Sequence, residues 1–352
     1  MTDTLTKFAY QTFQQGKSYF SVAHKMVSNR FAEVFAPDLN KGSKGLPPEI
    51  LLEMQQQLEK LLELDWYDAE RGIYPTSLLF DNPWDDFLRY YPSVWLDLPQ
   101  IWKRSIDKQY QQFSDDIETE GYPSYYVQNF HHQTDGYLSD FSANLYDLQV
   151  DLLFYGATDA MRRRILPPLK QGLAAFEGIS PRQLRVLDVA TGTGRTLRLI
   201  RAMLPKASLF GTDLSPAYLR KANQLLSQLP GELPQLCQAN AEDLPYLDNY
   251  FHGVTCVFTF HELPPEARQN VIEQCYRVTQ PGGVFVICDS IQSIDSPQLK
   301  PMMDNFDRIF HEPYYRHYIT DDLGVRLESV GFTDIRTENH FASKYWISRK
   351  PD

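Results

Sequence analysis

Hydrophobic and polar positions divide the chain into a helical N-terminal half and a C-terminal half in which strands and helices alternate. Between residues 3 and 36 the apolar side chains recur at helical spacing on one stripe: Leu5, Phe8, Ala9, Phe13, Gly16, Phe20, Ala23, Val27, Phe31 and Val34. The stripe predicts one long amphipathic helix that either docks on its own domain or lies at a bilayer interface. The opposite surface is slightly basic, through Lys7, Lys17, Lys25 and Arg30.

The rest of the N-terminal half is also predicted to be mostly helical. Apolar spacing and Pro48 indicate a second helix, and further helices are expected over 143–156 and 161–173. Residues 65–126 between them are dense in aromatic side chains. This segment is either the wall of a pocket for a flat substrate or ordinary core packing, which aromatic side chains dominate.

From residue 185 onward, short apolar runs alternate with helical patterns. Strands are expected over 185–190, 208–212, 253–260 and 284–288, with a last pair after residue 332. Alternation of this kind is typical of an α/β fold built on a parallel sheet.

The junction between the first of these strands and the next helix is predicted to be a ligand site. Asp188 lies in the strand, and Gly192 and Gly194 follow in a tight turn. Glycine lets the backbone approach a ligand closely, and the helix start favours a nucleotide. Position 197 is leucine, whereas a dinucleotide site would have a third glycine there. A carboxylate at Asp188 suits a cationic amino-acid group, which favours S-adenosylmethionine.

The second strand ends in another acid, Asp213, where a carboxylate is placed to hold both hydroxyls of a ribose. Leu214 behind it is positioned to contact an adenine. These placements follow the general rule that open α/β sheets bind ligands at the carboxyl ends of their strands.

Four motifs in order resemble the class I S-adenosylmethionine-dependent methyltransferase superfamily, in its small-molecule branch near the ubiquinone/menaquinone-biosynthesis type. They are Asp-x-x-x-Gly-x-Gly from Asp188, the acid at 213, Ala-Glu-Asp-Leu-Pro over 241–245, and Arg-Val-x-x-Pro-Gly-Gly over 277–283, and the resemblance covers roughly residues 180–350. It implies a Rossmann-like, seven-stranded, mostly parallel sheet with a reversed last strand. A helical region over 1–175 would then recognise the substrate or act as a lid, and 176–352 would be the methyltransferase domain.

The resemblance also assigns cofactor-binding residues. The methionine portion would lie against Asp188, Gly192 and Gly194, the ribose against Asp213, and the adenine against Leu214, Asn240 and Ala241. Ala190 and Thr191 in the same turn would also contact the cofactor. The family more often has aspartate where this chain has Asn240, and more often an acid where it has His252. An amide oxygen still accepts a hydrogen bond from the adenine amino group.

Methyl transfer from a sulfonium requires positioning and, for a phenol or acidic carbon, a general base. His261 follows the fourth strand beside the expected methyl group and is the first candidate for this base, ahead of two later histidines, His311 and His317. An alternative is that His261 only closes a turn. Candidates for substrate contact are His132, Tyr137, Asp289, Tyr314 and Tyr315.

The composition of the chain limits which classes of partner and cofactor we expect. A net charge of −11 argues against nucleic acid. Four scattered cysteines indicate buried free thiols in a reducing compartment, and the absence of clustered His or Cys predicts no metal site. We therefore expect a cytoplasmic enzyme with a small-molecule substrate, methylating oxygen or carbon of an aromatic or lipophilic acceptor. The oligomeric state stays open. Alternatives are a methyltransferase acting on protein or RNA, a non-catalytic scaffold and a nicotinamide oxidoreductase.

Overall fold

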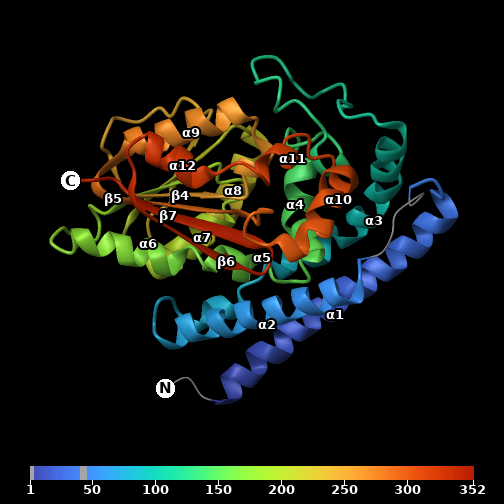
Figure 1. The fold of residues 1–352 in the computed structure, drawn as a ribbon, viewed down its shortest axis with the longest axis horizontal. Coiled ribbons are helices and arrows are strands. Elements are labelled where there is room, and N and C mark those ends of the chain that lie inside the picture. Colours follow the sequence, from blue (N-terminus) through green and yellow to red (C-terminus); the bar gives the residue numbers. More distant parts are fainter. Residues whose placement is uncertain (1–3, 40–45) are drawn as a thin grey trace.

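The computed structural model describes residues 4–39 and 46–352 and places a helical N-terminal part beside a central sheet covered by helices (Figure 1). Residue 3, where the predicted first helix begins, lies outside the described residues. Among the residues that the structure describes, no helix is long and apolar enough to cross a bilayer.

The sheet has seven strands in the order β3-β2-β1-β4-β5-β7-β6. The first five strands along the chain run parallel, whereas β7 is antiparallel to both β5 and β6. The predicted Rossmann-like sheet with a reversed last strand is therefore confirmed. The strands are β1 (Arg185–Val189), β2 (Ser208–Asp213), β3 (Gln235–Gln238), β4 (Phe251–Val257), β5 (Thr279–Ser290), β6 (Thr333–His340) and β7 (Ser343–Arg349).

Alternate side chains of each central strand enter different cores, because successive residues of a strand face opposite sides of the sheet. Leu187 and Val189 pack in the core beneath α9 (Pro265–Val278) and α12 (Leu323–Ser329). Val186 packs in the other core, with helices α6 (Leu166–Leu173), α7 (Arg195–Met203) and α8 (Pro216–Leu226). The central strands are thus buried on both faces, and their carboxyl ends are left as the place for a site.

Helices and short turns outside these layers surround the carboxyl ends of the strands and one flank of the sheet. In Figure 1 helices α1 and α2 lie along one side of the molecule. The elements are α1 (Thr4–Phe35), α2 (Pro48–Glu70), η1 (Thr76–Phe80), α3 (Trp84–Asp107), η2 (Phe130–His132), α4 (Asp140–Leu153), α5 (Thr158–Arg163), η3 (Ala174–Phe176), η4 (Phe260–Glu262), η5 (Pro297–Leu299), α10 (Lys300–Phe310) and α11 (Tyr315–Tyr318).

Helix α1 docks through its more polar side, so the interpretation that its apolar stripe packs on its own domain is wrong for most of that stripe. The buried residues are Tyr10, Gln14, Lys17, Ser21 and Ala32. The reason is a set of specific polar partners: Lys17 Nζ contacts Asp151 at 3.2 Å and Asn82 at 3.1 Å. Within the stripe, Phe13 packs partly inward against Phe80 and Trp84, and the half-exposed rings of Phe20 and Phe31 contact Tyr91 and Trp95 of α3.

A buried ion pair joins α1, α2 and α5. The guanidinium of Arg163 donates to both carboxylate oxygens of Asp65, at 2.8 and 2.7 Å. The phenols of Tyr10 and Tyr74 donate to the same carboxylate. Burial alone would lower the pKa of Arg163, but the neighbouring carboxylate outweighs this and raises it. The guanidinium of Arg163 therefore keeps its charge while fully buried.

Candidate functional site

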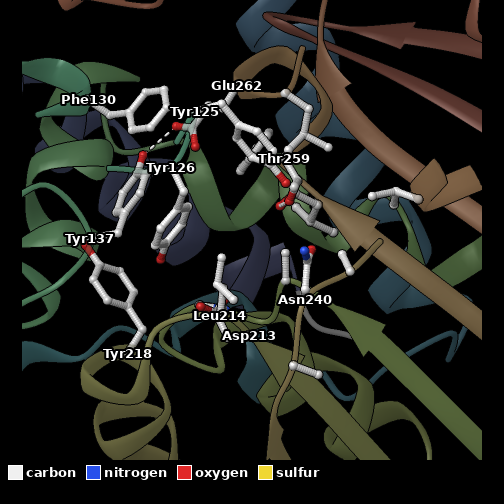
Figure 2. A pocket seen from close by; sticks show the side chains of 18 of the residues that line it. Tyr125, Tyr126, Phe130, Tyr137, Asp213, Leu214, Tyr218, Asn240, Thr259 and Glu262 are labelled. Atoms are coloured by element: carbon white, nitrogen blue, oxygen red, sulfur yellow. Dashed lines mark hydrogen bonds between the residues drawn. The ribbon is translucent and has the colours of Figure 1, made fainter. Parts of the chain in front are cut away.

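A cavity opens at the carboxyl ends of β1, β2 and β4, where the strand order reverses (Figure 2). One wall comes from the sheet half of the chain and the other from the N-terminal half. The lining residues are Tyr125, Tyr126, Phe130, Tyr137 and Tyr146 on the N-terminal side, and Ala190, Gly192, Asp213, Leu214, Tyr218, Ala239, Asn240, Ala241, Val257, Phe258, Thr259, Glu262, Leu263 and Val271 on the other. Ligands of α/β sheets bind at such switch points.

The turn after β1 provides the floor of the cavity, and its two glycines have different roles. A Cβ at Gly192 (φ +56°) would come no closer than 4.0 Å to any other group, the nearest being Tyr218, so the backbone is bare toward the cavity. A Cβ at Gly194 (φ +82°) would instead meet Ala222 Cβ of α8 at 3.0 Å. Gly192 is therefore the residue that leaves room for a ligand, and Gly194 lets α7 and α8 pack closely.

Asp213 is held beside that turn by backbone donors. The N–H of Gly192 donates to one carboxylate oxygen at 2.8 Å and the N–H of Ser215 to the other at 2.9 Å. Burial raises the pKa of Asp213 to about 6, although these N–H groups oppose the shift. The carboxylate is fixed in place with lone pairs left over for a ligand hydroxyl.

Asn240 lines the cavity with its amide oriented by the chain. Its Oδ1 accepts the N–H of Glu242 at 3.0 Å. The amide nitrogen and the second lone pair of Oδ1 are both available, so Asn240 can donate to a ring nitrogen as well as accept from an amino group. The contact between the amide oxygen and the adenine amino group stays a prediction.

Asp188, Thr191 and Gly194, predicted to hold the methionine portion, are not among the residues that line the cavity. Asp188 lies just behind the turn, where the hydroxyls of Thr255 and Thr191 each donate to its carboxylate at 2.7 Å. Burial raises the pKa of Asp188 to about 7 despite these two hydrogen bonds. The remaining predicted cofactor residues, Ala190, Gly192, Asp213, Leu214, Asn240 and Ala241, line one wall together.

Asp188→Asn is expected to stabilise the ligand-free protein in a pH-dependent way. The folded protein keeps the Asp188 proton up to a pKa of about 7, whereas the unfolded chain releases it near the ordinary value of 3.8. Stability contributed by the wild-type residue is therefore lost as pH rises through this window. The difference in melting temperature between variant and wild type, measured by calorimetry, should grow between pH about 4 and about 7. A constant difference across that range would contradict the assignment.

The N-terminal wall is aromatic. The rings of Phe130 and Tyr137 stack with centroids 5.5 Å apart, and Tyr137 meets Tyr218 of α8 edge-on at 5.5 Å. Burial raises the pKa of Tyr126 and of Tyr137, so both remain neutral phenols. Tyr137, a predicted substrate contact, does line the cavity. The wall suits a flat or apolar molecule.

Glu262 is a second acidic side chain that lines the cavity, besides Asp213. It belongs to a cluster of His131, Glu262 and Glu312, which we call the carboxylate–imidazole cluster. The Tyr137 hydroxyl donates to Glu262 Oε1, and His131 Nε2 lies 3.2 Å from the same oxygen. His131 Nε2 also lies 2.6 Å from Glu312 Oε1. Burial alone would lower the pKa of His131, but the two carboxylates outweigh it and raise the pKa to about 10.

The histidines predicted as bases lie outside the lining of the cavity. His261 donates from Nδ1 to Asp289 at 2.6 Å, and this carboxylate raises its pKa to about 9 against the effect of burial. Asp289 also accepts the backbone N–H groups of Thr259 and Phe260, at 2.9 and 2.7 Å. The pair therefore braces η4, the turn that presents Glu262, and the role of His261 as the base stays a prediction.

The other side chains predicted as bases or substrate contacts have partners outside the cavity lining. His311 stacks on Tyr110 with centroids 3.8 Å apart, and His317 Nδ1 lies 2.9 Å from Arg268 Nη1. His132 is buried, and this burial lowers its pKa to about 4. The hydroxyl of Tyr315 lies 2.9 Å from Ser290 Oγ, and Tyr314 packs edge-on against Tyr125.

Among the described residues, one group has the composition of a metal site. It is the carboxylate–imidazole cluster, whose potential ligand atoms lie within 4.8 Å of one another. With a pKa of about 10, His131 carries a proton at neutral pH, and a metal ion would have to displace it. The absence of a metal stays a prediction.

We expect treatment with EDTA followed by gel filtration to leave methyl transfer unchanged, because the His131 proton already offsets the carboxylate charge. The measurement is the initial rate before and after treatment. A loss of rate that added Zn²⁺ or Mn²⁺ restores would contradict this expectation.

Known proteins are similar in sequence to part of this chain. A methyltransferase domain family matches residues 186–283. An uncharacterised methyltransferase of Synechocystis is 32% identical over 159 residues, covering 45% of this chain and 70% of that protein. A demethylmenaquinone methyltransferase of Thermus thermophilus is 31% identical (41% of this chain, 60% of that protein), and a ubiquinone/menaquinone biosynthesis C-methyltransferase of Desulfotalea psychrophila is 32% identical (43% and 56%). The chain thus spans less than two thirds of the last two.

Among solved structures, a methyltransferase from Aquifex aeolicus is similar at 20% identity and a TM-score of 0.38, over 51% of this chain and 90% of that one.

Proposed function

Because the chain belongs to the class I S-adenosylmethionine-dependent methyltransferases, in the ubiquinone/menaquinone-biosynthesis branch, we propose that it methylates oxygen or carbon of a small aromatic or lipophilic acceptor. The observation that carries the proposal is the two-walled cavity. The wall formed by Gly192, Asp213 and Asn240 suits the cofactor, and the tyrosine-rich wall suits the acceptor.

The residues on the first wall fit S-adenosylmethionine. When bound, the cofactor supplies a methyl group activated by a positively charged sulfonium. The bare backbone at Gly192 leaves space for it, the fixed carboxylate of Asp213 can hold ribose hydroxyls, and Asn240 can donate to the adenine edge. Asp188 lies just behind the turn, and a positive charge bound in the cavity would favour its ionised form without direct contact.

The second wall supports the acceptor class. Tyr125, Tyr126, Phe130, Tyr137 and Tyr146 come from the segment that links the N-terminal helices to the sheet. We assign residues 1–175 as the part of the protein that covers the cavity and recognises the acceptor. Aromatic rings stack on a flat ring and exclude water, which favours displacement at the methyl group.

Glu262 takes the role of base in this proposal. Tyr137 and His131 both contact Oε1, so Oε2 is available to an acceptor O–H or acidic C–H. The carboxylate would accept the proton of the acceptor, whose oxygen or carbon would take the methyl group that the bound cofactor supplies. His131, held between Glu262 and Glu312, stabilises the cluster while the proton moves.

The experiment that tests the proposal is incubation of the protein with radiolabelled S-adenosylmethionine and cell extract divided into small-molecule and macromolecular fractions. We expect label in an organic-extractable aromatic compound. Label in protein or RNA only would favour the alternative, in which the N-terminal part recognises a macromolecule. No incorporation and no cofactor binding by calorimetry would reject the enzyme assignment.

Gly192→Val is expected to weaken cofactor binding by roughly 1–3 kcal/mol, because the new side chain occupies the space facing the cavity. The measurement is the Kd for S-adenosylmethionine by calorimetry. Gly72→Val is the matched control: Gly72 also has a positive φ (+70°), and a Cβ there meets nothing within 4 Å. Equal Kd values for the two variants would show that Gly192 does not face the ligand.

A further inference from the structure

The exposed side of α1 is unusually apolar for a surface helix. Because α1 docks through its more polar side, large hydrophobic side chains are left on the outside: Phe8, Tyr19, Phe20, Val22, Met26, Val27, Phe31, Val34 and Phe35. Five of these, Phe8, Tyr19, Met26, Val34 and Phe35, are between 66% and 73% exposed. Soluble surfaces rarely gather so many apolar side chains on one element, which indicates an interaction site.

Phe8, Tyr19 and Met26 lie along one line of the helix. They are separated by 11 and 7 residues, each close to a whole number of turns at about 3.6 residues per turn, and Val34, eight residues after Met26, lies roughly 80° from this line. The buried residues Tyr10, Gln14, Lys17 and Ser21 lie on the opposite side. At roughly 100° per residue, the exposed apolar arc covers about half of the circumference.

An arc this broad is wider than the seam of a two-helix coiled coil, which uses about two positions in seven. It matches a helix that lies in the plane of a bilayer with its apolar side among the acyl chains. Leu51 and Leu52 of α2, 48% and 56% exposed, add apolar surface on the neighbouring helix.

The charge of α1 is opposite to that of the protein. Lys7, Lys25 and Arg30 are exposed on the helix and Glu33 is its single acid, whereas the whole chain has a net charge of −11. The basic side chains of α1 attract an anionic lipid surface, whereas the net negative charge of the rest of the protein is repelled by that surface. We therefore expect the protein to attach through α1.

We propose that the exposed face of α1 docks the protein on anionic lipid bilayers, with Phe8, Tyr19, Met26 and Val34 inserted at the interface and the basic side chains among the headgroups. The proposal does not depend on the reaction in the cavity.

The test is co-sedimentation of the full chain with vesicles of phosphatidylcholine alone or mixed with phosphatidylglycerol. We expect wild type to bind the mixed vesicles more strongly, and F8S/Y19S/M26S/V34S to bind them roughly tenfold or more weakly. The matched control, L233S/L247S/I294S/V325S, removes apolar side chains that are 53% to 74% exposed outside α1, and should bind as wild type does. A circular-dichroism melt verifies that each variant is folded.

A second variant tests the charge. K7Q/K25Q/R30Q should lose the preference for anionic vesicles but keep binding to phosphatidylcholine. Two results would overturn the proposal. One is equal vesicle binding by wild type and the serine variant. The other is a wild-type dimer in sedimentation without lipid that the serine variant converts to a monomer, which would assign the face to a second copy of the chain.

Discussion

Replacing Glu262 with glutamine is expected to lower the turnover number roughly 10²–10⁴-fold while leaving the Kd for S-adenosylmethionine nearly unchanged. Glutamine keeps the size of the side chain and can still accept hydrogen bonds from Tyr137 and His131, but it cannot take the acceptor's proton. The measurement is single-turnover methyl transfer to the acceptor identified by labelling, combined with calorimetry of cofactor binding.

Glu242→Gln is the matched control for this change. Glu242 also accepts a hydrogen bond from a phenol of the N-terminal half, the hydroxyl of Tyr125. Glu242 itself is not among the residues that line the cavity. The control should keep turnover within about threefold of wild type, since it perturbs the contact between the halves without removing the base. Equal losses in both variants would mean that Glu262 only joins the two halves.

The cofactor wall was predictable because its pattern is local. Strand β1, the glycine turn and helix α7 occupy adjacent residues, and Asp213 is the last residue of the next strand, β2. The prediction of Gly192, Asp213, Leu214 and Asn240 required only that parallel strands end at one edge. The orientation of the Asn240 amide was not readable, because it depends on a turn contact with Glu242.

The residues that face the cavity beside η4 were harder to predict, because side-chain direction depends on distant partners. His261 and Glu262 are neighbours in η4, and chemistry alone favoured the histidine. Asp289, on a strand 28 residues later, binds the His261 ring, and Glu262 faces the cavity. The directions of His131 and His132 were not predictable either. Both residues have φ values near +57°, so the chain turns sharply between them, and of the two His131 contacts Glu262.

For α1 the periodicity correctly predicted a helix but indicated the wrong docked side. Hydrophobic burial is the usual basis for choosing the inward face. Here the contacts of Lys17 with Asp151 and of Tyr10 with Asp65 select the polar side, and their partners lie at least 55 positions away. Of the aromatic segment 65–126, Trp66 and Tyr74 are core residues, whereas Tyr125 and Tyr126 line the cavity, so each alternative holds for part of it.

Removing the guanidinium at position 163 should cost about 3–5 kcal/mol of unfolding free energy, since Arg163→Met leaves the fully buried carboxylate of Asp65 without its counterion. Denaturant unfolding followed by tryptophan fluorescence measures the loss, and Trp66 on α2 lies beside this network.

Arg220→Met is the matched control. It removes a similar ion pair with Asp140, but the two side chains are 58% and 63% exposed, so the change should alter stability little. Adding Asp65→Leu to Arg163→Met should recover part of the loss, because no buried charge then remains. Failure of the double variant to recover would mean that the cost comes from lost packing of the arginine stem.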